Sequence, residues 1–378
     1  MEFFEEGAVK FYAENKQVRK SEVFYNPGRQ FDRSLNILFV ESSGKKKLKG
    51  LELFSGSGVR GLRLCTETEK FASFIFNDIK SRDTIEKNIA LNGRNLRSIR
   101  LEIKSQDAKR FVSAEKYDYI DIDPFGSPVS YLDTAFTLIK KGGFIGLSAT
   151  DTAALFGSAQ KACMRKYGSL SLKTPYSNEI GIRILIKRVE ESANLFNFSV
   201  KPLLFDFNGN FLRLYFLVEK INDRHKIGFI YQCSRCPNRS TEKSLKCGYC
   251  GSRMVKAGGL WLGPIFDRQS VRNMYRTAMH ESGVDLEFNG ENTMKIYRLN
   301  IVRGKNKKRM SADDSITDYL KKLMGEKEAV TYYTTDELAS YLKTPEKSIR
   351  EFEDKTVLSS KGFRWTDSFE SLIKSKFS

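Results

Sequence analysis

The sequence predicts an α/β fold, in which a first domain built on a mostly parallel sheet is followed by a smaller α+β domain with a cysteine knuckle. Two observations support this fold class. Short apolar segments alternate with helix-length stretches through the first half of the 378-residue chain, and two Cys-x-x-Cys pairs follow in the second half. We expect the first domain to span residues 1–220 and the second to span residues 221–378.

The chain is strongly basic. It carries 64 Lys and Arg against 46 Asp and Glu, and this net charge of +18 favours a polyanion or an anionic membrane as partner. No apolar run approaches the ~18 residues of a membrane span, and the first six residues are acidic where a signal peptide would be basic. We therefore expect a cytoplasmic protein that binds nucleic acid and no membrane. With two histidines in the chain, histidine-based hydrolysis is disfavoured.

A glycine-rich turn follows the first predicted strand, residues 50–53. Gly56, Gly58 and Gly61 have the G-x-G-x-x-G spacing between a strand and a helix, where a ligand approaches the backbone and the helix N-terminus. By itself this pattern is a weak signal. Upstream, the aromatic run that ends at Phe24-Tyr25 either stacks a base or closes the edge of the sheet.

Acidic residues follow the next two predicted strands. Residues 71–76 end at Asn77-Asp78, and residues 99–103 precede Asp107-Ala108. An acid at the end of the second strand can accept hydrogen bonds from both ribose hydroxyls. Acids at successive strand ends suit a nucleoside without a pyrophosphate, and Glu52 just before the turn disfavours a dinucleotide. The predicted ligand is therefore S-adenosylmethionine, whose sulfonium and amino groups are cationic.

The fourth predicted strand, residues 117–122, runs into Asp123-Pro124-Phe125-Gly126. Ligands bind at this edge of open α/β sheets. Asp123 offers an acidic acceptor, Pro124 a backbone carbonyl and Phe125 an aromatic face, which together suit the planar amine of a nucleobase. The alternative is a plain strand-end turn, in which Asp, Pro and Gly are common.

The remaining segments complete the first domain. Residues 143–149 predict a fifth strand, and residues 178–193 a long helix. Residues 200–207 and 211–218 flank Asn208-Gly209, a strong hairpin signal. Five strand–helix units followed by a hairpin are the strand inventory of class I, Rossmann-like methyltransferases, whose last strand inserts antiparallel.

Several short motifs carry a more specific resemblance. They are Phe24-Tyr25-Asn26-Pro27, Gly58-Val59-Arg60-Gly61, Asn77-Asp78, and the segments at residues 121–128, 150–157, 163–167, 179–185 and 261–264. Together they resemble the tRNA (guanine-26 N2) dimethyltransferase family over nearly the whole chain, most specifically at Asp-Pro-Phe-Gly-Ser-Pro and Thr150-Asp151. One departure is Gly28-Arg29, because family members usually place the arginine directly after the proline. The role of Arg29 is therefore left open, while Arg33 keeps the family spacing.

The resemblance implies the transfer of two methyl groups from S-adenosylmethionine to the exocyclic N2 of guanine 26 of tRNA. It also implies a set of contacts to S-adenosylmethionine: Arg33, Arg60, Asp78, Asp107 and Ala108. Asp78 suits the ribose and Asp107 the adenine amine. The two arginines either hold the methionine carboxylate or are surface charges.

The guanine amine is a poor nucleophile because its lone pair is delocalised into the ring. We expect Asp123, helped by the carbonyl of Pro124, to accept the hydrogen bonds of the amine, align its lone pair with the sulfonium methyl and remove a proton. Phe125 would stack the base, opposite Phe24.

Cys233, Cys236, Cys247 and Cys250 form two Cys-x-x-Cys knuckles ten residues apart. Four thiolates can hold Zn²⁺ tetrahedrally, and a closed site of this kind is structural because no position stays open for water. The alternative is four reduced, free cysteines. We place the knuckle at residues 230–255.

Beyond the knuckle the sequence predicts a helix at residues 270–281. The basic run at residues 303–309 is either a phosphate contact or a loop. Residues 331–378 predict a small helix–turn–helix, either a clamp on RNA or a protein contact surface.

Two rival functions remain. One is an amino-methyltransferase acting on rRNA or DNA, and the other is a zinc-containing nucleic-acid binder that has lost catalysis. The intact Asp123 and the full set of nucleoside-binding acids argue against the second. No obligate protein partner is evident from the sequence.

Overall fold

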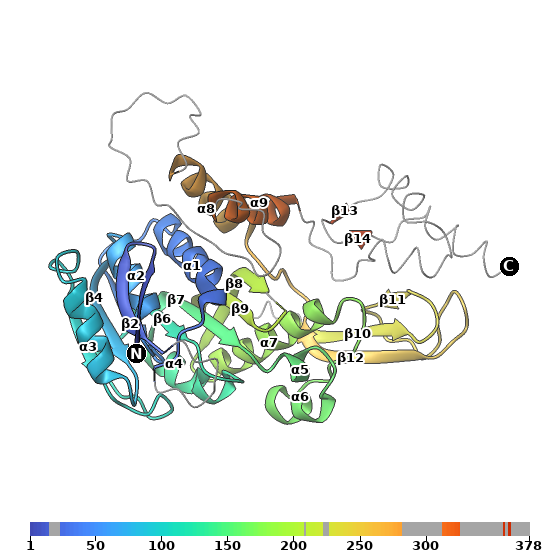
Figure 1. The fold of residues 1–378 in the computed structure, drawn as a ribbon. Coiled ribbons are helices and arrows are strands. Elements are labelled where there is room, and N and C mark those ends of the chain that lie inside the picture. The colour runs from blue at the N-terminus through green and yellow to red at the C-terminus, as the bar shows by residue number, and fades with distance from the viewer. Residues whose placement is uncertain are drawn as a thin grey trace. The chain divides into compact units, whose positions relative to one another are not determined.

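The computed structural model describes residues 1–14, 23–207, 209–221, 227–281, 312–325, 358–359 and 362–363 (Figure 1). The chain divides into two compact units, each made of segments that are separate in the sequence. The first unit comprises Met1–Thr150, Ser192–Ile221 and Phe266–Lys321, and the second comprises Asp151–Glu191, Asn222–Ile265 and Lys322–Ser378. The domain limit at residue 220 stays a prediction.

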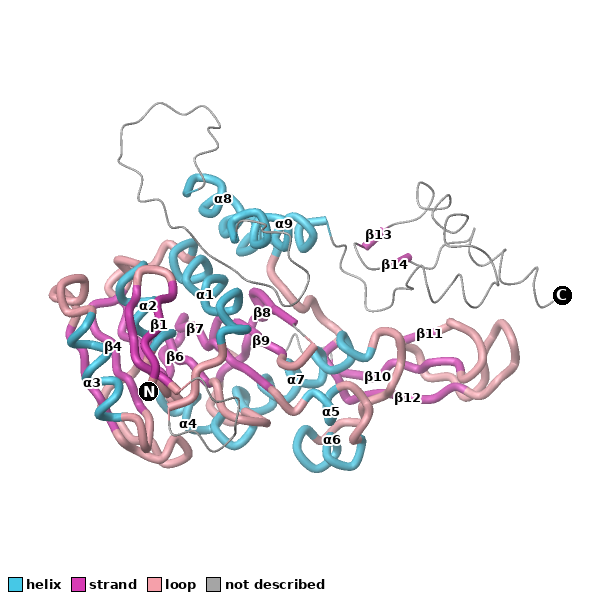
Figure 2. The backbone as a smooth tube through the Cα atoms, viewed as in Figure 1, coloured by secondary structure: helices cyan, strands magenta, loops and turns pink. Residues whose placement is uncertain are grey.

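A seven-stranded sheet forms the centre of the first unit (Figure 2). Its strand order is β5-β4-β3-β6-β7-β9-β8, and β9 alone runs antiparallel to its neighbours. The prediction of a mostly parallel sheet with an antiparallel last strand is confirmed. The strands are β3 (Leu48–Glu52), β4 (Phe71–Asn77), β5 (Arg100–Lys104), β6 (Tyr117–Ile122), β7 (Ile139–Ala149), β8 (Phe198–Phe207) and β9 (Leu212–Lys220).

Strand β7 is longer than predicted. The Lys140-Lys141-Gly142 segment has the composition of a turn, yet β7 begins at Ile139, which pairs with Tyr117 across a register shift. Gly142 has a φ of 79°, a conformation that glycine adopts without steric cost, so the strand continues through an irregularity instead of ending there.

Helices connect the strands of the first unit. They are α1 (Gln30–Ser42), α2 (Val59–Glu67), α3 (Arg82–Leu91) and α4 (Leu132–Leu138), with short 3₁₀ turns at η1 (Pro27–Arg29) and η2 (Val129–Tyr131). Helix α8 (Arg268–Glu281) packs against α1, and Tyr319 of α9 (Ala312–Gly325) meets the ring of Phe31 edge-on at 5.8 Å. The core consists of fully buried side chains on the central strands: Leu51, Phe74, Phe76, Tyr119, Ile120, Ile122, Ile145, Leu147, Leu214 and Phe216.

An N-terminal hairpin, which the sequence analysis did not predict, is formed by β1 (Glu2–Glu6) and β2 (Val9–Ala13). Asn88 of α3 and Asn92, which follows the end of this helix, hold β2 as a neighbouring strand would. Asn88 accepts from the N–H of Tyr12 (2.7 Å) and donates to its carbonyl (3.0 Å), and Asn92 does the same for Lys10 (3.1 and 2.7 Å). The hairpin is thereby fixed to the body of the first unit.

The second unit combines helices with a small sheet. It contains α5 (Thr152–Leu155), α6 (Gln160–Tyr167), most of α7 (Ser177–Asn194) and an antiparallel sheet of order β11-β10-β12. Its strands are β10 (Ile227–Cys233), β11 (Arg239–Ser240) and β12 (Met254–Trp261). We call residues 227–261, which carry this sheet and the four cysteines, the knuckle module.

Little of the C-terminal region can be compared with its prediction. The basic run at residues 303–309 lies outside the described residues. Most of the predicted helix–turn–helix also lies outside the described residues. Within its range the structure describes two short strands, β13 (Leu358–Ser359) and β14 (Gly362–Phe363), which pair antiparallel. Among the helices that the structure describes, none combines the length and the apolar run that crossing a bilayer requires.

Candidate functional site

The glycine-rich turn lies between β3 and α2, at the carboxyl edge of the sheet. Gly56 and Gly58 have φ values of 52° and 78°, and Gly58 precedes the first turn of α2. Asp78, at the end of β4, accepts a hydrogen bond from the N–H of Gly56 at 2.9 Å. The structure therefore brings the predicted ribose acceptor next to the predicted ligand turn.

Asn77 connects this region to the loop after β5. Its side chain donates to the carbonyl of Gln106 (3.0 Å) and accepts from the N–H of the same residue (3.0 Å). The following residues are Asp107, which is exposed, and Ala108, which is buried. Asp78 and Asp107 thus follow neighbouring strands, as predicted, and the carboxylate of Asp107 faces solvent.

Asp123 follows β6 and is held by two arginines. Arg29 approaches its Oδ1 at 2.5 Å, and Arg60, from the first turn of α2, approaches its Oδ2 at 3.0 Å. Both guanidinium groups also contact the fully buried Asp32, at 2.8 and 2.7 Å. The Asp123 side chain retains 18% exposure, so it can be reached from solvent.

A third arginine extends this group deeper into the sheet. Arg213 of β9 is fully buried and pairs with Asp121 of β6, which also accepts a hydrogen bond from the hydroxyl of Tyr119 at 2.5 Å. Three cations thus balance three anions. We call this set the arginine–aspartate cluster: Arg29, Arg60, Arg213, Asp32, Asp121 and Asp123.

Burial and the charges of the arginine–aspartate cluster shift the pKa values of the carboxyl groups at this edge of the sheet. Burial raises the pKa of Asp123, but the charges of Arg29 and Arg60 outweigh it and lower the pKa to about 2. Glu52, at the end of β3, shows the opposite result: burial, and after it the charge of Asp121, raises its pKa well above the usual range. At neutral pH the edge therefore offers an ionised acceptor at Asp123, while Glu52 is shifted toward its protonated form.

Arg33 is engaged elsewhere. Its guanidinium pairs with Glu6 of the N-terminal hairpin and donates to the carbonyl of Asn26 at 3.1 Å. Arg63 contacts the same Glu6 at 2.8 Å. Burial raises the pKa of Glu6, while Arg33 and Arg63 lower it to about 2. The structure does not bring Arg33 to the arginine–aspartate cluster, and its predicted ligand role stays a prediction.

The two predicted stacking rings touch each other. The centroids of Phe24 and Phe125 lie 5.3 Å apart with planes at 70°, an edge-to-face contact, and Phe125 is 64% exposed. A base can enter between them only after the rings separate. The loop of Phe125 is tied to β7 by Thr150, whose hydroxyl accepts from the N–H of Gly126 (2.7 Å) and whose N–H donates to the Gly126 carbonyl (2.9 Å). Pro124 is buried beneath it.

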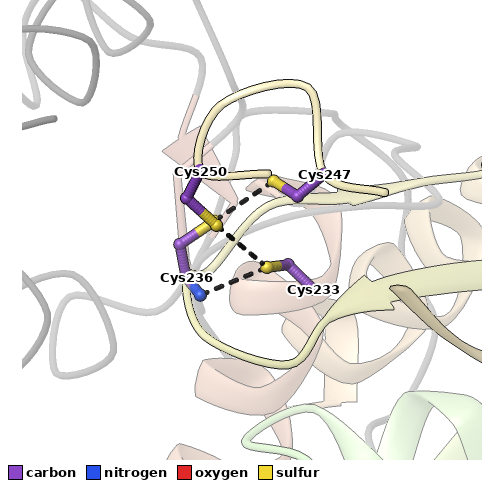
Figure 3. Close-up of side chains that lie close together, drawn as sticks. All are labelled: Cys233, Cys236, Cys247 and Cys250. Carbon is purple, nitrogen blue, oxygen red and sulfur yellow. Dashed lines mark hydrogen bonds between the residues drawn. The ribbon is translucent and has the colours of Figure 1, made fainter. Parts of the chain in front are cut away.

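The four predicted metal ligands converge in the knuckle module (Figure 3). Their sulfur atoms all lie within 4.8 Å of one another, with separations of 3.4 Å for Cys233–Cys250, 3.5 Å for Cys236–Cys247 and 3.7 Å for Cys236–Cys250. A tetrahedron with Zn–S bonds of 2.3 Å has sulfur atoms about 3.8 Å apart. The arrangement therefore fits a four-thiolate zinc site.

Four members of the cluster were not predicted as site residues from the sequence: Arg29, Asp32, Asp121 and Arg213. Arg213 had a usable signal: it is a single charge within the apolar run Phe211 to Phe216, and a buried charge requires a partner. Asp32 had a weaker signal, since it lies three residues before Leu35, on the same side of what the structure shows to be helix α1. Arg29 had none beyond its unusual position.

Comparisons with known proteins agree with this geometry. The model of the family described as N2,N2-dimethylguanosine tRNA methyltransferase matches residues 7–372. A tRNA (guanine(26)-N(2)/guanine(27)-N(2))-dimethyltransferase of Aquifex aeolicus is 33% identical over 308 residues, which are 76% of this chain and 78% of that protein. A tRNA (guanine(26)-N(2))-dimethyltransferase of Pyrobaculum aerophilum is 33% identical over 282 residues, 71% of this chain and 74% of that protein.

A solved structure supports the fold. Trm1 from Pyrococcus horikoshii, determined as a complex with S-adenosyl-L-methionine, superimposes with a TM-score of 0.76 at 22% sequence identity, covering 99% of both chains. The predicted class I methyltransferase fold is thereby confirmed.

Proposed function

Since this chain belongs to the N2,N2-dimethylguanosine tRNA methyltransferase family, we propose that it transfers two methyl groups from S-adenosylmethionine to the exocyclic N2 of guanine 26 of tRNA. The observation that carries the proposal is Asp123, an ionised acceptor that is fixed at the carboxyl edge of the sheet beside an exposed aromatic ring. A cytoplasmic location follows from the predicted substrate.

The residues at the edge fit S-adenosylmethionine. Gly56 and Gly58 lie before the N-terminal turn of α2, where the backbone can approach a ligand, and the acids after β4 and β5 suit the ribose and the adenine amine. We assign this contact to Asp78, Asp107 and Ala108, with Arg33 and Arg60 as partners of the carboxylate. When bound, S-adenosylmethionine supplies an electrophilic methyl group on a sulfonium sulfur.

Asp123 acts on the guanine amine. Its carboxylate accepts hydrogen bonds from the N–H groups, which turns the nitrogen lone pair out of the ring plane and toward the methyl donor. A pKa of about 2 makes Asp123 a weak base. A weak base suffices because the nitrogen carries a positive charge after methylation and releases its proton readily. The Pro124 carbonyl offers a second acceptor.

Phe24 and Phe125 form the base pocket. Each ring offers a stacking face worth about 1–3 kcal/mol, against a cost of a few kcal/mol for extracting the base. The guanine replaces the present edge-to-face contact between the rings, whose centroids are 5.3 Å apart. The rings therefore shield the site when no RNA is bound.

The knuckle module contributes charge for the tRNA backbone. Residues 227–265 contain six cations and a single acid, Glu242. Five of the cations are exposed: Arg235, Lys243, Lys246, Arg253 and Lys256. Contacts between such side chains and phosphates add affinity without reading sequence. We propose that residues 221–378 bind tRNA. We also propose that Zn²⁺ held by the four cysteines keeps the knuckle module, residues 227–261, folded.

The test is methyl transfer to unmodified tRNA transcripts, read by nucleoside mass spectrometry, for the wild type and Asp123→Asn. The wild type should form N2,N2-dimethylguanosine, and a transcript with adenine at position 26 should not be modified there. Asp123→Asn should lose activity by about 10² to 10⁴-fold while it still binds S-adenosylmethionine in calorimetry. Methyl groups at position 27 would extend the specificity, whereas modification of rRNA but not tRNA would refute the proposal.

A further inference from the structure

The carboxylate of Asp123 is held in a defined plane. One guanidinium meets each oxygen, Arg29 at Oδ1 (2.5 Å) and Arg60 at Oδ2 (3.0 Å). A carboxylate has about four acceptor positions, two on each oxygen. The two arginines use one position on each, so each oxygen keeps one position for a substrate. Rotation of the carboxylate is resisted from both ends.

Arg29 is itself immobilised by three contacts. Its Nη2 donates to Asp32 (2.8 Å) and to the hydroxyl of Ser148 (2.8 Å), and its guanidinium carbon lies 4.3 Å from the ring centroid of Phe211. Only 11% of its side chain is exposed. With the ion pair to Asp123, four contacts thus fix Arg29, so that its guanidinium can hold the Asp123 carboxylate in place.

We propose that Arg29 is a positioning residue that enables the second methyl transfer, by keeping Asp123 aligned when the substrate has only one N–H left. This inference rests on the proposed function and adds the determinant of the product, dimethylguanosine instead of monomethylguanosine. Arg60 cannot replace Arg29 in this role because it meets only the other oxygen and is drawn toward Asp121, 3.6 Å from its Nε.

The two methylation steps make different demands on Asp123. The unmodified amine has two N–H groups, so a carboxylate that has turned can still accept from one of them. The monomethylated amine has a single N–H, and its methyl group occupies the other position. A misaligned carboxylate therefore slows the second step more than the first, because displacement of a reacting group by about 1 Å costs on the order of 10²-fold in rate.

The test compares wild type with Arg29→Met, which keeps an unbranched apolar side chain but removes the guanidinium and its charge. Single-turnover reactions on a tRNA transcript are followed by mass spectrometry of both products. We expect the first step to slow by less than about tenfold and the second by on the order of 10²-fold, so that monomethylguanosine accumulates. The KM for tRNA should not change.

Two further variants separate positioning from folding. Ser148→Ala removes a contact of Arg29 and leaves Asp123 untouched; it should shift the product ratio in the same direction by a smaller factor. Arg29→Lys keeps the charge but replaces the two guanidinium nitrogens that contact Asp123 and Asp32 with a single ammonium nitrogen, so it should also accumulate the monomethyl product. These two variants decide the question if Arg29→Met does not fold.

An unchanged ratio of the two products in the folded Arg29 variants overturns the proposal, as does an equal slowing of both steps. Neither result affects the proposed function, provided that the wild type makes dimethylguanosine. If the wild type forms no methylguanosine, the proposed function fails and the inference with it.

Discussion

The arginine–aspartate cluster of the first unit and the four cysteines of the second both gather charge-bearing side chains in a buried place, but only the first is self-sufficient. Three cations and three anions neutralise one another inside a large apolar core. Around its cysteines the knuckle module has only a small buried cluster, in which Met254 packs with Cys233, Cys236 and Cys247. We therefore expect the fold of the knuckle module, unlike the arginine–aspartate cluster, to depend on a bound ion.

The largest effect is expected from removing the metal ion, which should unfold the knuckle module and leave the first unit folded. A structural zinc site contributes on the order of 10 kcal/mol to folding, so chelation or Cys236→Ser should unfold the knuckle module. Hydrogen exchange should show lost protection in β10 and β12 and retained protection in β3 to β7. Cys163→Ala, which changes a buried cysteine outside the knuckle, is the control. Full protection of β10 in metal-free protein would show that the module is stable alone.

Glu6→Gln should lower the free energy of unfolding of the first unit. The change leaves Arg33 and Arg63 without their shared anion, and breaking a buried pair costs about 3–5 kcal/mol. Urea unfolding at pH 7 measures this loss. Glu5→Gln, one residue earlier on an exposed ion pair with Lys10, should have almost no effect.

The stability of the Glu6→Gln variant should also depend on pH differently from that of the wild type. Because folding lowers the pKa of Glu6 from 4.5 to about 2, its contribution to stability is complete above pH 4.5 and is lost as the pH falls toward 2. The wild type should therefore lose stability across this window more steeply than Glu6→Gln. Parallel pH profiles for the two proteins would contradict the ionised state of Glu6.

Phe125→Ala tests the proposed stacking of the guanine base in the first unit, and its expected effect is smaller. Loss of one stacking face should cost about 1–3 kcal/mol, seen as a lower kcat/KM for tRNA with unchanged melting, because the ring is 64% exposed. Phe125→Tyr should keep most of the activity. Leu195→Ala, also at an exposed apolar residue, serves as the control for loss of surface area. Equal activity in Phe125→Ala and wild type would exclude stacking by this ring.

Charge changes on the knuckle module should have the smallest effect and act on binding alone. Lys243→Gln and Lys246→Gln should each lower the slope of log affinity against log salt by about one or less, with kcat unchanged. Glu242→Gln, at the position just before Lys243, should strengthen tRNA binding slightly. An unaltered salt slope in the double lysine variant would remove this face from the tRNA contact.

Local patterns predicted most of the fold. Alternation of apolar segments located the seven strands of the main sheet, and Asn208-Gly209 located the hairpin of β8 and β9, because both signals lie within a few residues. The hairpin of β1 and β2 was missed, since its partners are Asn88 and Asn92, some 80 positions away in the sequence. The four cysteines could be assigned to one metal site from their spacing alone, because paired metal ligands lie only a few residues apart in the sequence.

The candidate site was predicted only in part, for the same reason. Asp78, Asp107 and Asp123 could be named from their positions after strands. The partners of Asp123 could not be predicted, because Arg29 lies 94 residues away and no local rule connects a turn before α1 with the end of β6. The family motif pointed to Arg60 as a ligand contact, whereas the structure adds its ion pairs with Asp32 and Asp123.

The pairing of Asp121 with Arg213 has a consequence for how the chain is made. Ribosomal synthesis delivers β6 about ninety residues before β9, so a buried aspartate emerges well ahead of the cation that neutralises it. A buried charge without its partner is strongly unfavourable. We therefore expect the nascent chain to delay closure of this part of the sheet until residue 213 has left the ribosome, which makes the last strand to insert the one that commits the first unit to its native state.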